Sequence, residues 1–156
     1  MKIFVTVGTT KFDSLIKYID TESVFYNLSV EFQIANGKYI PKTHPYFTFI
    51  DGNSIVKKYQ ESDVIITHAG AGTIYKLLEL KKKIIVVPNL ERSDKHQMDI
   101  ARYVSENKYA LVAYSLTQLE MFLNSIYDYD FKEFNKKNFF KAEEILGYIL
   151  TGAVIT

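Results

Sequence analysis

The residues best suited to chemistry lie in one stretch at the centre of the chain, Asp63–Thr73. Its second half, His68-Ala69-Gly70-Ala71-Gly72-Thr73, has no bulky apolar side chain, and its two glycines let a ligand approach the backbone closely. A helical pattern of apolar residues follows from Thr73. Backbone N–H groups and the positive end of the helix dipole converge at such a turn, which predicts a site for an anion, most naturally a phosphate. The alternative interpretation is that both glycines serve packing alone.

Strands and helices alternate along the chain, and this alternation must position the glycine-rich turn. Short apolar runs predict strands, and apolar residues at helical spacing predict the helices between them. The expected strands are Ile3–Val7, Val30–Ala35, Tyr46–Ile50, Val64–Ile66, Ile84–Val87 and Ala110–Ala113. The expected helices are Lys11–Asp20, Asn53–Glu61 with Asn53 as its cap, one that opens at Thr73, Asp94–Glu106, Leu116–Tyr127, and a last apolar helix at about 138–151 capped by Asn138. The pattern predicts an α/β fold, a single Rossmann-like domain over residues 1–156 with a mostly parallel sheet flanked by helices.

Three turns between a strand and a helix are expected at the carboxyl edge of this sheet, where α/β folds bind ligands. They are Gly8-Thr9-Thr10, His68–Thr73 and Ser93–Gln97. Residues in or near these turns have two interpretations. His68 either orients its turn through a backbone hydrogen bond or contacts a ligand. Asp94 and Gln97 match a capping box as well as a ligand site, and Asp13 suits the first turn of a helix better than catalysis.

Composition narrows the class of protein. The chain has 156 residues, 47% apolar and 24% charged, which suits one globular domain with a real core. Its net charge of +1 gives no indication of nucleic-acid binding. There is no cysteine, no signal-peptide pattern at the start and no apolar run long enough to span a bilayer, so a cytoplasmic location is expected.

Five motifs in this order resemble one known family. They are Phe4-Val5-Thr6-Val7-Gly8-Thr9, Phe12-Asp13, Thr67–Thr73, Ile85-Val86-Val87-Pro88 and His96-Gln97. Together they are similar to the glycosyltransferase family 28 C-terminal domain, over about Lys2–Val112. The nearest likeness is to its small stand-alone members, the PssE-type subunits of bacterial polysaccharide transferases and the catalytic subunit of the eukaryotic dolichol-linked UDP-GlcNAc transferase.

The resemblance implies the nucleotide-binding half of a GT-B glycosyltransferase. Its glycine turn, here Gly70, Ala71, Gly72 and Thr73, would hold the diphosphate of a UDP-sugar. Gly8, His96 and Gln97 would also line the donor, while His68 and Thr9 would face the reaction centre. Amide donors at the helix start would stabilise charge on the departing UDP, so no metal and no other cofactor is expected.

The chain departs from the family pattern at two places. The first turn has only Thr10-Lys11 between Gly-Thr and Phe-Asp, where relatives carry a longer turn with His and Pro. Lys76 stands where many relatives have a Glu that grips the ribose, and a lysine cannot accept a hydrogen bond. Glu79, one turn on, is the candidate replacement, and no catalytic base is assigned.

The resemblance leaves two main functional hypotheses. In the first, the chain is the donor-binding subunit of an inverting, two-chain hexosyltransferase that acts on a lipid-linked acceptor with a membrane-anchored acceptor-half partner. In the second, it is a non-catalytic enhancer of a partner transferase. A UDP-sugar epimerase fragment is a third and weaker possibility. The apolar C-terminal segment is expected to dock that partner, or a second copy in a homodimer, and to keep the chain peripheral to the membrane; packing on the chain's own sheet is the alternative.

Overall fold

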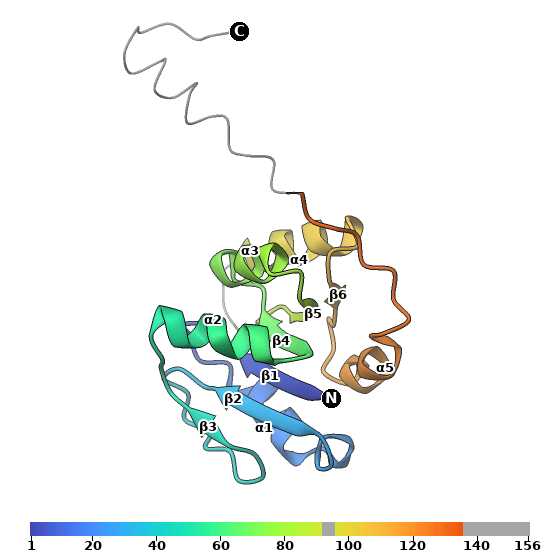
Figure 1. Cartoon of the computed structure of the whole chain (residues 1–156). Helices are drawn as coiled ribbons and strands as arrows, with labels where there is room; N and C mark the ends of the chain where they lie inside the picture. The colour runs from blue at the N-terminus through green and yellow to red at the C-terminus, as the bar shows by residue number, and fades with distance from the viewer. Residues whose placement is uncertain (92–95, 136–156) are drawn as a thin grey trace, which may run out of the picture.

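Six parallel strands form one sheet at the centre of the molecule (Figure 1). The computed structural model describes residues 1–91 and 96–135. The strands are β1 (Lys2–Thr6), β2 (Ser29–Gln33), β3 (Tyr46–Phe47), β4 (Val64–His68), β5 (Lys83–Val87) and β6 (Leu111–Val112), in the order β3-β2-β1-β4-β5-β6. The direction of the chain across the sheet reverses between β1 and β4, which are neighbours in the sheet. Doubly wound folds bind ligands at this switch point, outside the carboxyl ends of the strands.

Helices cover both faces of the sheet (Figure 1). They are α1 (Asp13–Thr21), α2 (Gly52–Glu61), α3 (Ala71–Glu79), α4 (His96–Glu106) and α5 (Gln118–Ser125), with a short 3-10 helix η1 (Ser23–Phe25) after α1. The side chains of α1 and α5 pack on one face, and those of α2, α3 and α4 on the other. Val5 and Phe4 of β1 face opposite sides, because successive side chains of a strand alternate. The expected α/β architecture with a parallel sheet is therefore confirmed.

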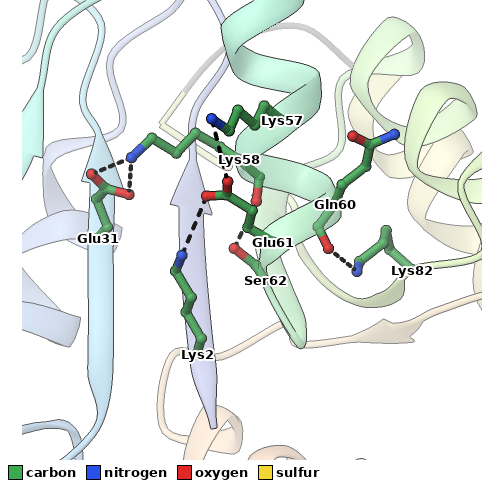
Figure 2. A network of polar contacts seen from close by, with 8 residues as sticks. All are labelled: Lys2, Glu31, Lys57, Lys58, Gln60, Glu61, Ser62 and Lys82. Carbon is green, nitrogen blue, oxygen red and sulfur yellow. Dashed lines mark hydrogen bonds and ion pairs between the residues drawn. The ribbon is translucent and has the colours of Figure 1, made fainter.

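Ion pairs attach α2 to the strands beneath it (Figure 2). Lys58 Nζ lies 2.8 Å from both carboxylate oxygens of Glu31 on β2. Glu61 lies between Lys2 Nζ at 3.5 Å and Lys57 Nζ at 3.8 Å. Lys82 Nζ donates to the Gln60 carbonyl at 3.2 Å, so a cation sits where the α2 dipole is negative.

Several element boundaries differ from those expected from the sequence. The cap of α2 is Asp51 and not Asn53, since Asp51 Oδ1 accepts hydrogen bonds from the N–H groups of Asn53 and Ser54, each at 3.0 Å. The third strand ends at Phe47 and not at Ile50, because its partner strand turns away at Ala35, which has φ of 51°. The first helix begins at Asp13 and not Lys11, whose N–H is bonded to Asn36 Oδ1 at 3.2 Å. The expected apolar helix at 138–151 lies outside the described residues.

Candidate donor-binding site

Of the expected turn Ser93–Gln97, the structure describes only His96 and Gln97. Two expected turns and the start of a loop lie at the carboxyl edge of the sheet. They follow β1, β4 and β5, which are adjacent strands, and the registers pair Thr6 with Thr67 and His68 with Val87. Neighbouring parallel strands lie about 4.8 Å apart, so residues that follow them are brought close together. The turn after β4 leads into α3 at Gly70, and the loop after β5 leads towards α4.

The His68 imidazole lies against two of the glycines. A Cβ atom built on Gly8 would stand 2.7 Å from His68 Cε1, and one built on Gly70 would overlap His68 Nε2 and Cε1. Gly8 also has φ of +64°, a conformation that disfavours a side chain. Gly8 and Gly70 are therefore glycines because His68 occupies the space that their side chains would need. These contacts also bring Gly8, His68 and Gly70 together in one site.

The start of α3 has the properties of an anion site. Gly70 is the N-cap residue and provides no side-chain cap, and the first backbone hydrogen bond of the helix runs from Ile74 N–H to Gly70 O at 3.0 Å. No hydrogen bond joins the N–H groups of Ala71, Gly72 or Thr73 to any residue of the described ranges. Ala71 and Gly72 are exposed, and a Cβ on Gly72 would meet nothing within 4 Å. Three amide donors at the positive end of the dipole therefore lack a partner within residues 1–91 and 96–135.

A buried phenol underlies this helix start. Tyr59 of α2 is 5% exposed, and burial raises the pKa of its hydroxyl. Hydrogen bonding with Thr6 and Thr73 acts in the opposite direction on the same pKa. Tyr59 thus stays neutral.

Three side-chain amides that sequence reasoning did not identify hold the first turn. Gln33 Nε2 donates to Gly8 O at 2.8 Å, Asn36 Oδ1 accepts from Lys11 N–H, and Asn89 Nδ2 donates to Lys11 O at 3.3 Å. Each amide lies at or just beyond the carboxyl end of a strand, and Gln33 and Asn89 are both buried. The sequence signal that could have indicated two of them is a polar residue at or just after the end of an apolar strand: Gln33 after Phe32, and Asn89 after Pro88.

The two predicted donor-binding residues at the start of α4, His96 and Gln97, differ in burial. Gln97 is buried, and its Oε1 accepts from Asn89 N–H at 2.9 Å, whereas His96 is exposed. Gln97 therefore holds the end of β5, and Asp94, the other residue of the capping-box interpretation, lies outside the described residues. Thr9, on the first turn, is exposed.

Carboxylates give no evidence for a metal centre. Asp13 accepts from the N–H groups of Lys38 and Tyr39 at 3.0–3.2 Å, which supports its structural interpretation. The chain has an Asp-x-Asp pair, Asp128 and Asp130, but it follows α5, and Asp130 is paired with Lys132 Nζ at 3.2 Å. Within residues 1–91 and 96–135, no group of three His, Cys, Asp or Glu side chains could hold an ion.

The sheet order and the glycine turn at its switch point define a Rossmann-like domain. The family model described as "Glycosyltransferase family 28 C-terminal domain" matches residues 2–143, and the chain belongs to this family. It is 35% identical, over 64% of its length, to the human UDP-N-acetylglucosamine transferase subunit ALG13. It is 26% identical to the Yarrowia lipolytica subunit of the same name, over 72% of this chain and 65% of that protein.

Solved structures agree on the fold. An NMR solution structure of ALG13 superposes with a TM-score of 0.62 at 21% identity and covers 93% of this chain and 94% of that one. MurG of Acinetobacter baumannii superposes with a TM-score of 0.58 at 18% identity, over 80% of this chain but 42% of that one. The chain spans about a tenth of the human and mouse subunits that it matches. No helix of residues 1–91 and 96–135 is long and apolar enough to cross a membrane.

Proposed function

We propose that this chain is the donor-binding subunit of a two-chain glycosyltransferase that moves a hexose from a UDP-sugar to a lipid-linked acceptor. The observation that carries the proposal is the start of α3, where the N–H groups of Ala71, Gly72 and Thr73 are unbonded among the described residues. A diphosphate supplies the negative charge and acceptor oxygens that such a helix start binds. Family membership supports the choice of a UDP-sugar over other phosphate ligands.

The same donors would contribute to the reaction. As the bond between the anomeric carbon and the diphosphate breaks, negative charge accumulates on the departing UDP. Fixed amide donors stabilise that charge without reorganising, so the helix start can act in place of a metal ion. His68 and Thr9 would face the sugar, with Gly8, His96 and Gln97 around the donor. Inversion at the anomeric carbon follows if an acceptor hydroxyl attacks directly from the face opposite to UDP.

Under this proposal, the ribose would need a partner other than the Glu that many relatives carry. Lys76 occupies that position here, and its Nζ lies 3.9 Å from Glu79 Oε2. The ammonium cannot accept the ribose hydroxyl hydrogens, whereas the Glu79 carboxylate can. We propose that Lys76 orients Glu79 and that Glu79 serves the ribose.

A partner subunit would supply the acceptor half. The chain matches 42% of the MurG structure and 31% of the Prochlorococcus marinus MIT 9215 UDP-N-acetylglucosamine--N-acetylmuramyl-(pentapeptide) pyrophosphoryl-undecaprenol N-acetylglucosamine transferase. ALG13 is itself described as a transferase subunit. A membrane-anchored partner would place this chain at the cytoplasmic face of a membrane, next to a lipid-linked acceptor, while a homodimer would form only in its absence.

A non-catalytic enhancer is the second candidate. The short first turn and Lys76 favour it, because both remove side chains that related sequences have near the donor. The two candidates differ in how they depend on His68. With the acceptor-half partner present, His68→Ala should abolish transfer if this chain contains the reaction centre, and should leave transfer unchanged if it only enhances its partner.

Two glycines provide a matched test of donor binding. Gly72 in α3 and Gly52 in α2 both lie in the first turn of a helix, and a Cβ on either meets nothing within 4 Å. We expect Gly72→Val to abolish UDP binding measured by calorimetry, because its isopropyl group would cover the amide donors, while Gly52→Val binds UDP like the wild type. Equal UDP affinity in the two folded variants would refute the assignment of the site.

A further inference from the structure

Gln33 is a buried side chain whose polar atoms are all used at one place. It is the last residue of β2 and is 3% exposed. Its Nε2 donates to Gly8 O at 2.8 Å and to Thr48 O at 2.9 Å, and its Oε1 accepts from Thr6 Oγ1 at 2.6 Å. One amide therefore joins the carboxyl ends of three strands, β1, β2 and β3.

These contacts determine the orientation of the amide. A flipped Gln33 would place its oxygen against two carbonyl oxygens and its NH₂ group against the Thr6 hydroxyl, so it would lose both bonds to Gly8 and Thr48. Because the Thr6 hydroxyl hydrogen is given to Gln33, the Thr6 oxygen accepts from Gly8 N–H, at 3.3 Å. Both polar groups of Gly8 are thus held by a single pair, Thr6 and Gln33.

Gly8 in turn touches the imidazole of His68. The left-handed conformation of Gly8 and its contact with His68 Cε1 put the first turn and the histidine in fixed relation. The same ring also lies against Gly70, the N-cap residue of α3. A continuous line of contacts therefore runs from Gln33 through Gly8 and His68 to the anion site.

We propose that Gln33 is a positioning residue, which sets the place of the His68 ring and of the turn that carries Thr9 relative to the start of α3. Its importance for transfer rests on the proposed function, but its effect on His68 does not. Gln33 would act through Gly8 and would leave the amide donors of α3 in place. It would therefore govern the geometry of the reacting side of the site rather than the affinity for UDP.

The test uses NMR of the full chain, which has only three histidines, His44, His68 and His96. The variant Gln33→Met keeps the length of the side chain and removes all three hydrogen bonds. We expect it to shift the His68 Cε1–H signal and to leave the His96 signal unchanged. The dissociation constant of UDP should stay within about twofold of that of the wild type.

A control separates positioning from a general loss of stability. Asp20 is also buried, and it accepts hydrogen bonds from Tyr39, Lys42, Thr43 and His44, away from His68. We expect Asp20→Asn to shift the His44 signal and to leave that of His68 unchanged. An unchanged His68 signal in Gln33→Met, or an equal His68 shift in Asp20→Asn, would overturn the proposal. Failure of UDP to bind the wild type would instead overturn the proposed function, and the His68 shifts would still be measurable.

Discussion

Two glycines of the candidate site should respond in opposite ways to the same substitution. Gly8 has φ of +64°, and a Cβ atom on it would stand 2.7 Å from His68 Cε1. Gly72 lies in the helix α3, and a Cβ atom built on it would have no neighbour within 4 Å. Replacement by alanine adds one methyl group in each case, so the difference between the two variants isolates the local backbone and the contact with His68.

The magnitudes follow from the geometry. A side chain in the left-handed region costs roughly 1–2 kcal/mol. Displacing the imidazole from its rotamer adds about 0.5–1.5 kcal/mol, so Gly8→Ala should destabilise the fold by roughly 1.5–3.5 kcal/mol. Gly72→Ala should raise stability by about 0.4–1 kcal/mol, because it restricts the unfolded chain at a position where alanine is tolerated.

Chemical denaturation of both variants and the wild type measures these differences. The midpoints should lie on opposite sides of the wild-type value with similar slopes, since the surface exposed on unfolding hardly changes. Gly52→Ala, at the start of α2, is the control for an open helical glycine and should behave like Gly72→Ala. If Gly8→Ala were as stable as Gly72→Ala, the packing of His68 against Gly8 would be refuted.

Two further predictions concern the rest of the fold. Burial lowers the pKa of His44, although Asp20 acts to raise it, and His44 Nε2 has no hydrogen-bond partner among the described residues. Below the ordinary histidine pKa of about 6.5, His44 binds a proton more readily in the unfolded chain than in the folded one, so the free energy of unfolding should fall as the pH drops. Urea denaturation at a series of pH values should show a smaller fall for His44→Gln than for the wild type. Lys58 forms a half-buried pair with both oxygens of Glu31, whereas the Lys57 side chain is 75% exposed. Thermal unfolding should show a loss of about 1 kcal/mol for Lys58→Met and less than about 0.5 kcal/mol for Lys57→Met, and equal losses would contradict the assigned difference between the pairs.

The pattern of apolar runs was sufficient to predict the alternation of strands and helices and the parallel sheet. It also placed the glycine turn between a central strand and a helix, because strand length, glycine content and helical spacing are local properties. Local reasoning was less accurate at Asp51. Asp51 and Asn53 are both good capping residues two positions apart, and their spacing alone does not decide which of them begins α2.

The contacts that shape the site could not be read from local spacing. Gln33, Asn36 and Asn89 are separated by up to 78 residues from the backbone groups of the first turn that they hold. No periodicity reports such pairs, because they arise only when the carboxyl ends of neighbouring strands come together. For the same reason, the sequence indicated only that Gly70 and Gly72 could serve either a ligand or packing, and the contact of Gly70 with His68 is a tertiary feature.

The two sides of the candidate site differ in how their backbone groups are used. On the first turn, Gly8 N–H and C=O are both bonded to buried side chains, so that turn is held in one conformation. At the start of α3, three successive N–H groups have no partner among the described residues, and their direction is set by the helix. Under the proposed function this division has a chemical advantage. Donors that are already oriented need no rearrangement when charge develops on UDP, and a fixed His68 keeps the reacting side aligned with them. A partner subunit would then need to bring only the acceptor and to exclude water, rather than to assemble the donor site itself.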